Sequence, residues 1–444
     1  MTASGAHCWR MPIASLKRLG LSMRLGLLIS SAGLGLSMAG LPSGALASEP
    51  FAVRVGLLHS LQGTMRNTEY KLVEAEELAI AEINAAGGVL IKGRRYRIVP
   101  VRRDGASDWD VFAEQASRLI DQDQAVVLFG GWTSASRKAM LPVVEAKDAL
   151  LFYPISYEGQ ECSKNIFYTG AIPNQQSEPA TRFMLRRSPA AGKPFFLVGS
   201  DYVFPRTSHA ITKQQLQVLG GLVVGESYLP LGEVWNISPL VSSIKKALPD
   251  GGVIINHLNG DQNIVFFNRL RDMGVTPENG YHVMSYTILE DEIDQIGAEL
   301  LEGHYVASNY LMSVPTTESK RFIEAFKARY GDERVVTDPQ ESAYNMVYLW
   351  KAAAEKANSF DPVAVRQALV GVSFAAPQGK VKMMPNHHLA QTVRIGKITR
   401  SGKVRIVEVS PGLVEPQAWN QYERHTKGQA CDWTDPAKGE RYRF

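Results

Sequence analysis

Apolar and polar positions follow two alternating periods along most of the chain. Short continuous apolar runs, typical of buried strands, are separated by longer stretches in which apolar residues recur three and four positions apart, typical of amphipathic helices. The first series of predicted elements has helices at 69–86, 108–122 and 137–146 between strands at 53–59, 96–104, 125–130 and 150–154. A repeated strand–helix order of this kind predicts a doubly wound parallel sheet of the α/β class.

The same alternation begins again after Asn174 and predicts a second, similar lobe. Its helices are expected at 177–187, 206–219, 241–247 and 263–273, and its strands at 194–200, 221–229, 252–258 and 282–285. Two similar lobes joined by a hinge typically bind a ligand between them and close around it. The sequence therefore predicts a hinged clamshell with the ligand between the lobes.

The remaining segments are expected to join the lobes by more than one crossing. Segment 303–310 is predicted to cross back, followed by helices at 318–330, 340–357 and 362–369 and by β structure at 379–384, 391–399 and 403–410. We therefore assign 48–172 and 305–377 to lobe 1, 173–304 and 378–410 to lobe 2, and 411–444 to an irregular C-terminal tail rich in Pro, Gly and charge. The hinge candidates are 171–173, 303–304 and 376–377.

The N-terminus has the pattern of a secretory signal peptide. Residues 1–47 contain four basic residues and no acidic one, with an apolar stretch at 25–41 and the small-residue motif Ala45-Leu46-Ala47. This pattern predicts cleavage near Ala47, before Ser48, and hence a periplasmic location. A membrane anchor is the alternative, but several Gly and Ser residues interrupt the apolar stretch.

The charge balance changes when this segment is set aside. The chain has 48 basic and 44 acidic residues, and the four excess basic residues all lie in 1–47. The predicted mature protein is therefore neutral in formal charge, which gives no electrostatic reason to expect nucleic acid or an anionic membrane as partner.

Two cysteines remain in the predicted mature chain, Cys162 and Cys431. In an oxidising compartment we expect them to form a disulfide, with two unpaired thiols as the alternative. Such a bond would hold the C-terminal tail near the loop after Tyr157.

Two predicted strands end in residues suited to a small polar ligand. The run 125–129 ends in Gly130-Gly131, and Thr133 and Ser134 then precede a helix whose first N–H groups are unpaired. The run 150–154 leads into a polar, aromatic loop. Because open α/β sheets bind ligands at the carboxyl ends of their strands, we expect a site for a small polar molecule here.

Motifs along nearly the whole predicted mature sequence resemble those of one family. They include FGGWTSASRKAMLPVVE at 129–145, LLFYPISYEGQECSKNIFYTGAIPNQQ at 150–176, GSDYVFPRT at 199–207, NGDQN at 259–263 and DPQESAYNMVYLW at 338–350. With these motifs the chain is similar to the urea and short-chain amide branch of the periplasmic substrate-binding proteins of ABC transporters, within the branched-chain amino-acid binding class. The motifs YEGQECS and NGDQN favour the urea-binding proteins over the cytoplasmic amide sensors of the same fold.

The resemblance implies a fold, partners and a ligand. It implies the type I periplasmic binding protein fold, with two doubly wound parallel-sheet lobes joined by a multi-strand hinge. It further implies urea as ligand, the permease subunits of an ABC transporter as partners, and no cofactor. Urea is planar and neutral, so its site needs hydrogen-bond donors for one carbonyl oxygen and several acceptors for the N–H groups.

The resemblance also implies the ligand-binding residues. The turn at 132–134 would offer backbone N–H and hydroxyl donors, and the segment 155–156 would offer backbone acceptors. The expected set is Trp132, Thr133, Ser134, Tyr153, Ile155, Ser156, Tyr202, Asn259, Tyr286 and Thr287. The alternatives are a helix N-cap role for Ser134 and ordinary packing for Tyr153 and Tyr202.

Other classes of site lack their motifs in this sequence. The pair His387-His388 has no third metal ligand nearby in sequence, and adjacent residues of an extended chain point to opposite faces. The sequence has no G-x-S-x-G elbow, no P-loop and no G-x-G-x-x-G motif. We therefore expect no catalysis, no metal and no nucleic-acid partner. A formamide- or acetamide-binding protein, and an amide sensor for a regulatory partner, remain the alternatives.

Overall fold

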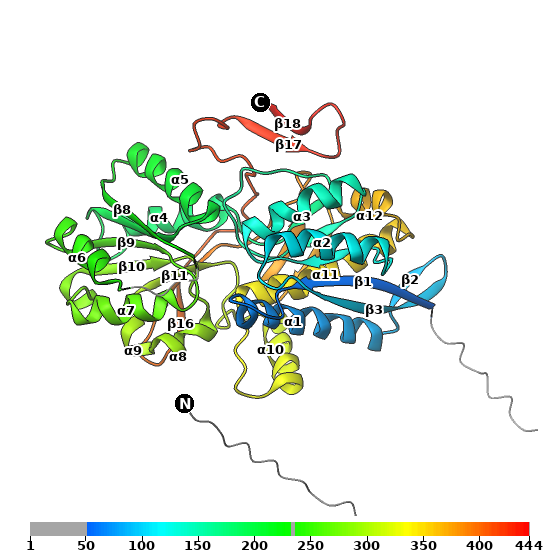
Figure 1. Cartoon of the computed structure of the whole chain (residues 1–444), viewed down its shortest axis with the longest axis horizontal. Helices are drawn as coiled ribbons and strands as arrows, with labels where there is room; N and C mark the ends of the chain where they lie inside the picture. Colours follow the sequence, from blue (N-terminus) through cyan, green and yellow to red (C-terminus); the bar gives the residue numbers. More distant parts are fainter. Residues whose placement is uncertain (1–50, 232–235, 444) are drawn as a thin grey trace, which may run out of the picture. The chain divides into compact units, whose positions relative to one another are not determined.

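The structure is a computed structural model that describes residues 51–231 and 236–443. The chain forms two α/β lobes, each built on its own sheet (Figure 1). The first sheet has six strands in the order β2-β3-β1-β4-β5-β6. They are β1 Phe51–His59, β2 Val89–Ile91, β3 Arg94–Asp104, β4 Leu128–Gly130, β5 Leu151–Tyr153 and β6 Ile166–Tyr168. All pairings are parallel except β2 with β3, which a tight turn connects.

Six helices belong to this first lobe. They are α1 Arg66–Ala85, α2 Trp109–Asp121, α3 Ser134–Ala146, α10 Thr317–Tyr330, α11 Asp338–Ala357 and α12 Pro362–Leu369. Strands β4 and β5 are buried throughout, as expected for parallel strands covered by helices. A small antiparallel sheet of β12 Ser373–Ala376, β13 Gly379–Met383 and β14 Leu389–Ala390 packs against α11.

The second lobe contains a seven-stranded sheet of order β16-β15-β11-β10-β9-β7-β8. Its strands are β7 Phe195–Ser200, β8 Val223–Leu229, β9 Gly252–His257, β10 Tyr281–Ser285, β11 Tyr305–Ser308, β15 Arg394–Ile398 and β16 Val404–Val409. Its helices are α4 Ser177–Arg186, α5 Val203–Leu219, α6 Ser238–Ala247, α7 Gln262–Asp272, α8 Ile293–Ile296 and α9 Ala298–Leu301, with 3-10 turns η1 Pro173–Gln175, η2 Pro277–Asn279 and η3 Glu290–Glu292.

The chain crosses between the two lobes three times, after β6, after β11 and after β14. Asn309 ties these crossings together, because its side-chain amide donates to the carbonyl oxygens of Gln175, at 3.4 Å, and Thr392, at 2.8 Å. Gln175 in turn donates to the carbonyl oxygen of Leu389, at 2.8 Å. The three crossings therefore form one hydrogen-bonded hinge.

Two of the predicted lobe boundaries differ from the structure. Strand β11 lies in the second sheet, although 305–377 was expected in lobe 1, because it pairs with both β10 and β15 before the chain crosses. Strands β13 and β14 pair with β12, and His388 bridges to Tyr168, so 378–390 belongs to the first lobe and not to the second. Of the hinge candidates, 171–173 adjoins a crossing, whereas 303–304 precedes β11 and 376–377 lies at the end of β12, within one lobe.

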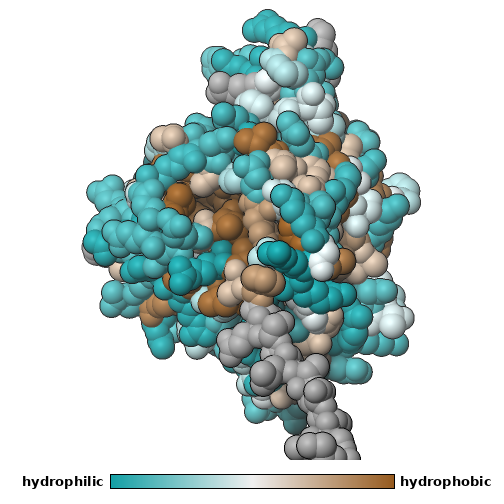
Figure 2. Space-filling model, turned by 90° about the vertical axis from the view of Figure 1, so that its right-hand side faces the viewer, coloured by the Kyte–Doolittle hydropathy of each residue, from teal (hydrophilic) through white to brown (hydrophobic). Residues whose placement is uncertain are grey.

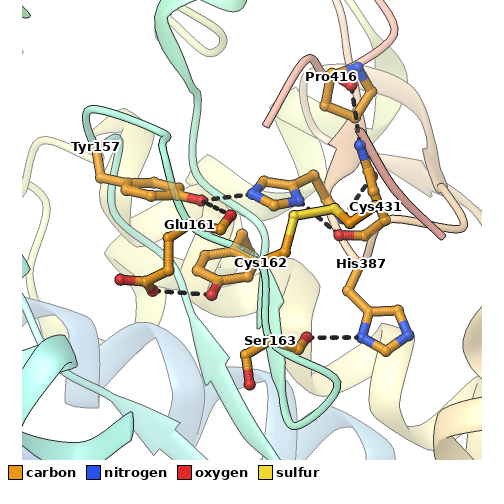
Figure 3. Close-up of a disulfide and its surroundings, with 10 residues drawn as sticks. Tyr157, Glu161, Cys162, Ser163, His387, Pro416 and Cys431 are labelled. Carbon is orange, nitrogen blue, oxygen red and sulfur yellow. Dashed lines mark hydrogen bonds between the residues drawn. A yellow bond between two sulfur atoms is a disulfide. The ribbon is translucent and has the colours of Figure 1, made fainter. Parts of the chain in front are cut away.

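The C-terminal tail is more regular than predicted. It contains the antiparallel pair β17 Gln429–Asp432 and β18 Gly439–Arg443. The predicted disulfide joins Cys162, in the loop after β5, to Cys431 in β17 (Figure 3). Beside it, Tyr157 and Tyr168 stack with the ring of His388, and the backbone N–H of Trp433 donates to the carbonyl oxygen of Pro385. The prediction that this bond holds the tail near the loop after Tyr157 is confirmed.

The segment 414–426, which we call the strap, contacts both lobes. On the first lobe, the backbone N–H of Gln160 donates to the carbonyl oxygen of Ala418, at 2.7 Å. On the second lobe, the amides of Asn420 and Gln421 donate to the buried carboxylate of Glu178 in α4. The strap therefore links the two lobes in addition to the three crossings.

The surface seen in Figure 2 combines a polar rim with a hollow in which apolar residues gather. Apolar side chains also remain exposed at several separate points of the first lobe, among them Phe51 in β1, Leu90 in β2 and Val363 in α12. No helix within 51–231 and 236–443 has the length and apolarity that a membrane span requires. The predicted signal peptide lies outside the described residues.

Candidate ligand-binding site

The turn between β4 and α3 depends on two glycines. Gly130 and Gly131 have φ angles of 149° and 82°, in a region that disfavours side chains. A Cβ on Gly130 would lie 2.0 Å from the carbonyl oxygen of Leu58 in the neighbouring strand β1. These glycines let the chain leave the sheet sharply, so that α3 begins directly at the carboxyl end of β4.

Thr133 is the N-cap of α3, since its hydroxyl oxygen accepts from the backbone N–H of Ser136, at 3.0 Å. The N-cap role considered for Ser134 is therefore filled by Thr133. The N–H groups of Ser134 and Ala135 belong to the first turn, which has no intrahelical acceptors for them. They are the donors that this turn can offer to a ligand oxygen.

Ser134 is engaged with two charged side chains. Its hydroxyl donates to Oε2 of Glu158, at 2.5 Å, and its oxygen accepts from Nη1 of Arg137, at 3.2 Å. Ser134 and Glu158 are each 2% exposed, so these are buried, charge-assisted contacts. Because the hydroxyl proton points to Glu158, the expected donation from this hydroxyl to a ligand does not occur in this arrangement.

Arg137 is a fully buried cation whose charge is matched by two carboxylates. Its Nε donates to Glu161, at 2.8 Å, and its Nη2 contacts Glu158, at 3.3 Å. The guanidinium carbon also lies 4.8 Å and 4.1 Å from the ring centres of Tyr153 and Tyr157, in cation–π geometry. Every nitrogen of this guanidinium therefore has a partner inside the protein.

The two pKa shifts within this cluster agree with that pairing. Burial by itself lowers the pKa of Arg137, but the charges of Glu161 and Glu158 outweigh it and hold the pKa well above its usual value. Burial likewise raises the pKa of Glu161, yet Arg137 and Lys138 together lower it to about 2. Arg137 and Glu161 are thus both ionised near neutral pH.

Tyr153 and its neighbours form the floor of this region. The Tyr153 side chain is fully buried, and its hydroxyl donates to the carbonyl oxygen of Trp132. The side chain of Ile155 is 6% exposed, and its backbone lies against Gly170 so closely that a Cβ there would be 2.1 Å from the Ile155 carbonyl carbon. Tyr153 therefore orients the turn at Trp132 as well as supporting Arg137.

The second lobe contributes Tyr202, the N-cap residue of α5, and Asn259, after β9. The side-chain amide of Asn259 donates to the Tyr202 hydroxyl, at 3.3 Å. Burial raises the pKa of Tyr202 above its usual range, and the nearby Tyr153 and Glu158 raise it further. Tyr202 therefore lies within electrostatic range of Tyr153 and Glu158, which belong to the opposite lobe. We call Ser134, Tyr153, Glu158, Tyr202 and Asn259 the interlobe site.

Two other predicted residues line a small cavity where the lobes meet. Ser156 follows β5 in the first lobe and Tyr286 follows β10 in the second, and the cavity between them measures about 30 Å³. That is room for about two water molecules. The carboxyls of Glu290 and Asp338 also line it, and burial raises their pKa values to about 8 and about 6.

The structure thus separates the predicted residues into groups. Ser134, Tyr153, Tyr202 and Asn259 gather at the interlobe site, whereas Ser156 and Tyr286 line the cavity. Thr287 donates its hydroxyl to the carbonyl oxygen of Leu258 in its own lobe. Trp132 is half-buried, and its carbonyl is taken by Tyr153.

Sequence reasoning missed Arg137 and Glu158. The available signal was the spacing of Ser134 and Arg137, which places them on one face of a helix, next to a loop with two glutamates at 158 and 161. Ion pairing across different elements cannot be read from spacing alone. Among the described residues, no group of three or more His, Cys, Asp or Glu side chains could hold a metal ion.

Comparison with known proteins places this geometry in a family. The profile described as a periplasmic binding protein domain matches residues 53–425. A Leu/Ile/Val-binding protein homolog 7 from Brucella abortus is 24% identical over 369 residues, covering 79% of this chain and 88% of the relative. A match of 30% identity to a protein named limonene hydroxylase from Geobacillus stearothermophilus covers 25% of this chain and 21% of that protein, so the chain spans about a fifth of that relative.

Solved structures share the fold. A solute-binding protein of an ABC transporter from Rhodopseudomonas palustris, in complex with 3,4-dihydroxybenzoic acid, superposes with a TM-score of 0.72 at 20% identity. The match covers 82% of this chain and 99% of that one. The predicted fold class is confirmed, whereas urea as ligand stays a prediction. The family consists of extracytoplasmic solute-binding proteins and not of enzymes. The chain belongs to the periplasmic binding protein family, with the type I fold of the Leu/Ile/Val-binding-like substrate-binding proteins of ABC transporters.

Proposed function

We propose that this substrate-binding protein captures urea between its two lobes and delivers it to the membrane permease of an ABC transporter. In this proposal residues 1–47 direct export and are removed near Ala47, so that the mature protein works in the periplasm. Formamide or acetamide is the alternative ligand, because either presents the same carbonyl and N–H groups.

The observation that carries the proposal is the charge state of the interlobe site. Arg137, the one buried cation that contacts this site among the described residues, has four of its five N–H donors engaged by Glu158, Glu161 and Ser134, and two carboxylates balance its charge. A carboxylate ligand would meet no uncompensated cation here and would lie against the buried carboxylate of Glu158, so its desolvation would be poorly offset. A neutral ligand avoids both costs, so the site favours one.

The remaining groups suit a planar ligand with one carbonyl and several N–H groups. The N–H groups at the start of α3 supply donors for the carbonyl oxygen, and the Glu158 carboxylate and the Tyr202 hydroxyl oxygen supply acceptors.

Capture would proceed by closure of the hinge. In an open form the ligand meets one lobe first, and contacts made only with both lobes then shift the population to the closed form. The ion pair between Lys71 of α1 and Asp291 of η3 joins the lobes in the structure described here and supports such a closed form. The closed form would be the one that docks on the permease.

Calorimetric titration of the exported, purified protein tests this proposal. Urea, formamide, acetamide, benzoate and leucine are titrated in parallel under the same conditions. Tightest binding of urea supports the proposal, and preference for an amide selects the alternative. Binding of benzoate or leucine with no heat from urea or the amides would overturn it.

A further inference from the structure

The Glu158 carboxylate lies in the interlobe site with part of its acceptor capacity unused. Its Oε2 accepts from Ser134 and its Oε1 from Arg137 Nη2, one hydrogen bond for each oxygen. A carboxylate oxygen can accept two, and within the described residues no further hydrogen bond reaches either oxygen of Glu158. Two acceptor positions therefore remain on a side chain that is only 2% exposed.

The groups around Glu158 come from both lobes. Ser134 and Arg137, both from α3, hold the carboxylate from the first lobe. Tyr202, from the second lobe, lies close enough for Glu158 to act on it electrostatically, yet no hydrogen bond joins the two side chains among the described residues. The next residue, Gly159, lies against Pro173 of η1, so the loop that carries Glu158 reaches the second lobe.

Glu161 provides an internal comparison. It is a glutamate of the same loop and the same Arg137 cluster, but Arg137, Lys138 and the hydroxyl of Tyr168 occupy its oxygens. Glu161 completes the cluster from the side of the disulfide (Figure 3). Within the described residues, only Glu158 combines pairing with Arg137 and unused acceptor positions.

We propose that Glu158 is the specificity-determining residue of the interlobe site, accepting the N–H groups of a neutral amide and excluding carboxylates. This inference rests on the proposed function, since it assumes that the ligand carries an amide. The chemistry is selective because a carboxylate in the place of an amide puts two anionic oxygens against the buried anion and has no N–H to donate.

Acetamide and acetate test this role, because they have nearly the same shape and differ in the group that faces Glu158. Glu158→Gln keeps the size of the side chain and an acceptor for Ser134, removes the negative charge and adds an N–H₂ donor. The variant is expected to bind urea and acetamide about tenfold or more weakly, the usual loss for one hydrogen bond to a charged group. Its affinity for acetate relative to acetamide is expected to rise by about tenfold or more.

Glu161→Gln is the matched control, since it removes from the same cluster a carboxylate whose oxygens are already occupied. Thermal unfolding of each variant reports whether the cluster survives the change. The control is expected to shift unfolding while leaving the ratio of acetate to acetamide affinity close to that of the unchanged protein. An equal change of this ratio in both variants, or no change in Glu158→Gln, overturns the proposal.

Glu158→Asp keeps the test decisive if Glu158→Gln does not fold. It retains the charge and withdraws the carboxylate by one methylene, so it is expected to lose urea affinity while still rejecting acetate. Acetate binding by Glu158→Asp, or full urea affinity, contradicts the proposal. If the unchanged protein binds neither urea nor any amide, the proposed function fails; if it binds them and Glu158 has no effect on selectivity, only this inference fails.

Discussion

Ser134 donates its hydroxyl to Glu158 across 2.5 Å and thereby ties the first turn of α3 to the loop after β5. Both residues are buried, and Arg137 contacts both of them. The helix start that offers N–H donors and the carboxylate that offers acceptors are therefore held in a fixed relation.

Ser134→Ala is expected to weaken urea binding by about five- to tenfold, since Glu158 loses the hydrogen bond that positions it. The free energy of unfolding should fall by about 1–3 kcal/mol, because a buried carboxylate oxygen loses its partner. Calorimetry and denaturant unfolding measure the two effects. Ser136→Ala is the control, since the Ser136 hydroxyl bonds within the same turn to the Thr133 carbonyl. Unchanged urea affinity in Ser134→Ala would contradict the role of this contact.

Tyr202→Phe removes the hydroxyl that the second lobe contributes and keeps the ring. Urea affinity is expected to fall by about fivefold, the effect of one neutral hydrogen bond, with little change in stability. Tyr305→Phe is a comparison in the same lobe, because this ring packs against Phe183 at a centroid distance of 5.4 Å. If Tyr202→Phe and Tyr305→Phe both bind urea as tightly as the unchanged protein, the Tyr202 hydroxyl does not contact urea, and the prediction is wrong.

Reduction of the disulfide should loosen the strap and the hairpin that follows it. Cys431→Ser is expected to lower the free energy of unfolding by about 2–4 kcal/mol, because the bond closes a long loop between Cys162 and Cys431. Hydrogen exchange should rise in 414–443, and less so at the N-terminal strands of the first sheet. Equal protection of 414–443 from hydrogen exchange with and without the disulfide would contradict this prediction. It would mean that the hydrogen bonds to both lobes hold the strap without the disulfide.

His59 should make stability depend on alkaline pH. Burial lowers its pKa, but Glu76, at 2.7 Å, and Glu69 outweigh burial and raise the pKa to about 9. A raised histidine pKa adds stability that is complete below the unfolded value of about 6.5 and is lost as the pH rises through about 9. Unfolding by denaturant at pH 6 and pH 9.5 should show a loss of roughly 1–3 kcal/mol, reduced in His59→Gln. An equal loss of stability between pH 6 and pH 9.5 in the unchanged protein and in His59→Gln would contradict this role of His59.

The alternation of strands and helices was sufficient to predict the two-lobed α/β fold. The predicted strand at 252–258 and helix at 340–357 match β9 and α11 to within two residues at each end. These elements are buried, and their hydrophobic pattern follows directly from the faces that they bury. The first sheet also contains β2 and β6, two short strands that the alternation did not reveal.

The errors arise where long-range pairing decides the structure. The sequence of β11 does not indicate to which sheet the strand belongs. Its pairing with β10 and β15 places it in the second lobe. The hairpin of β17 and β18 lacks a clear apolar alternation, and the disulfide at Cys431 fixes its position. In the sequence, Glu158 looks like an ordinary residue of a polar loop. Its burial is explained by its ion pair with Arg137, which the sequence does not reveal.

A crystal structure of the exported protein grown with urea tests the central claim most directly. The claim predicts density for one planar molecule between the two lobes, with its oxygen at the N–H groups that begin α3 and its nitrogens at Glu158 and Tyr202. Density for a co-purified carboxylate or amino acid at this place, or an interlobe site that stays empty at saturating urea, would contradict it.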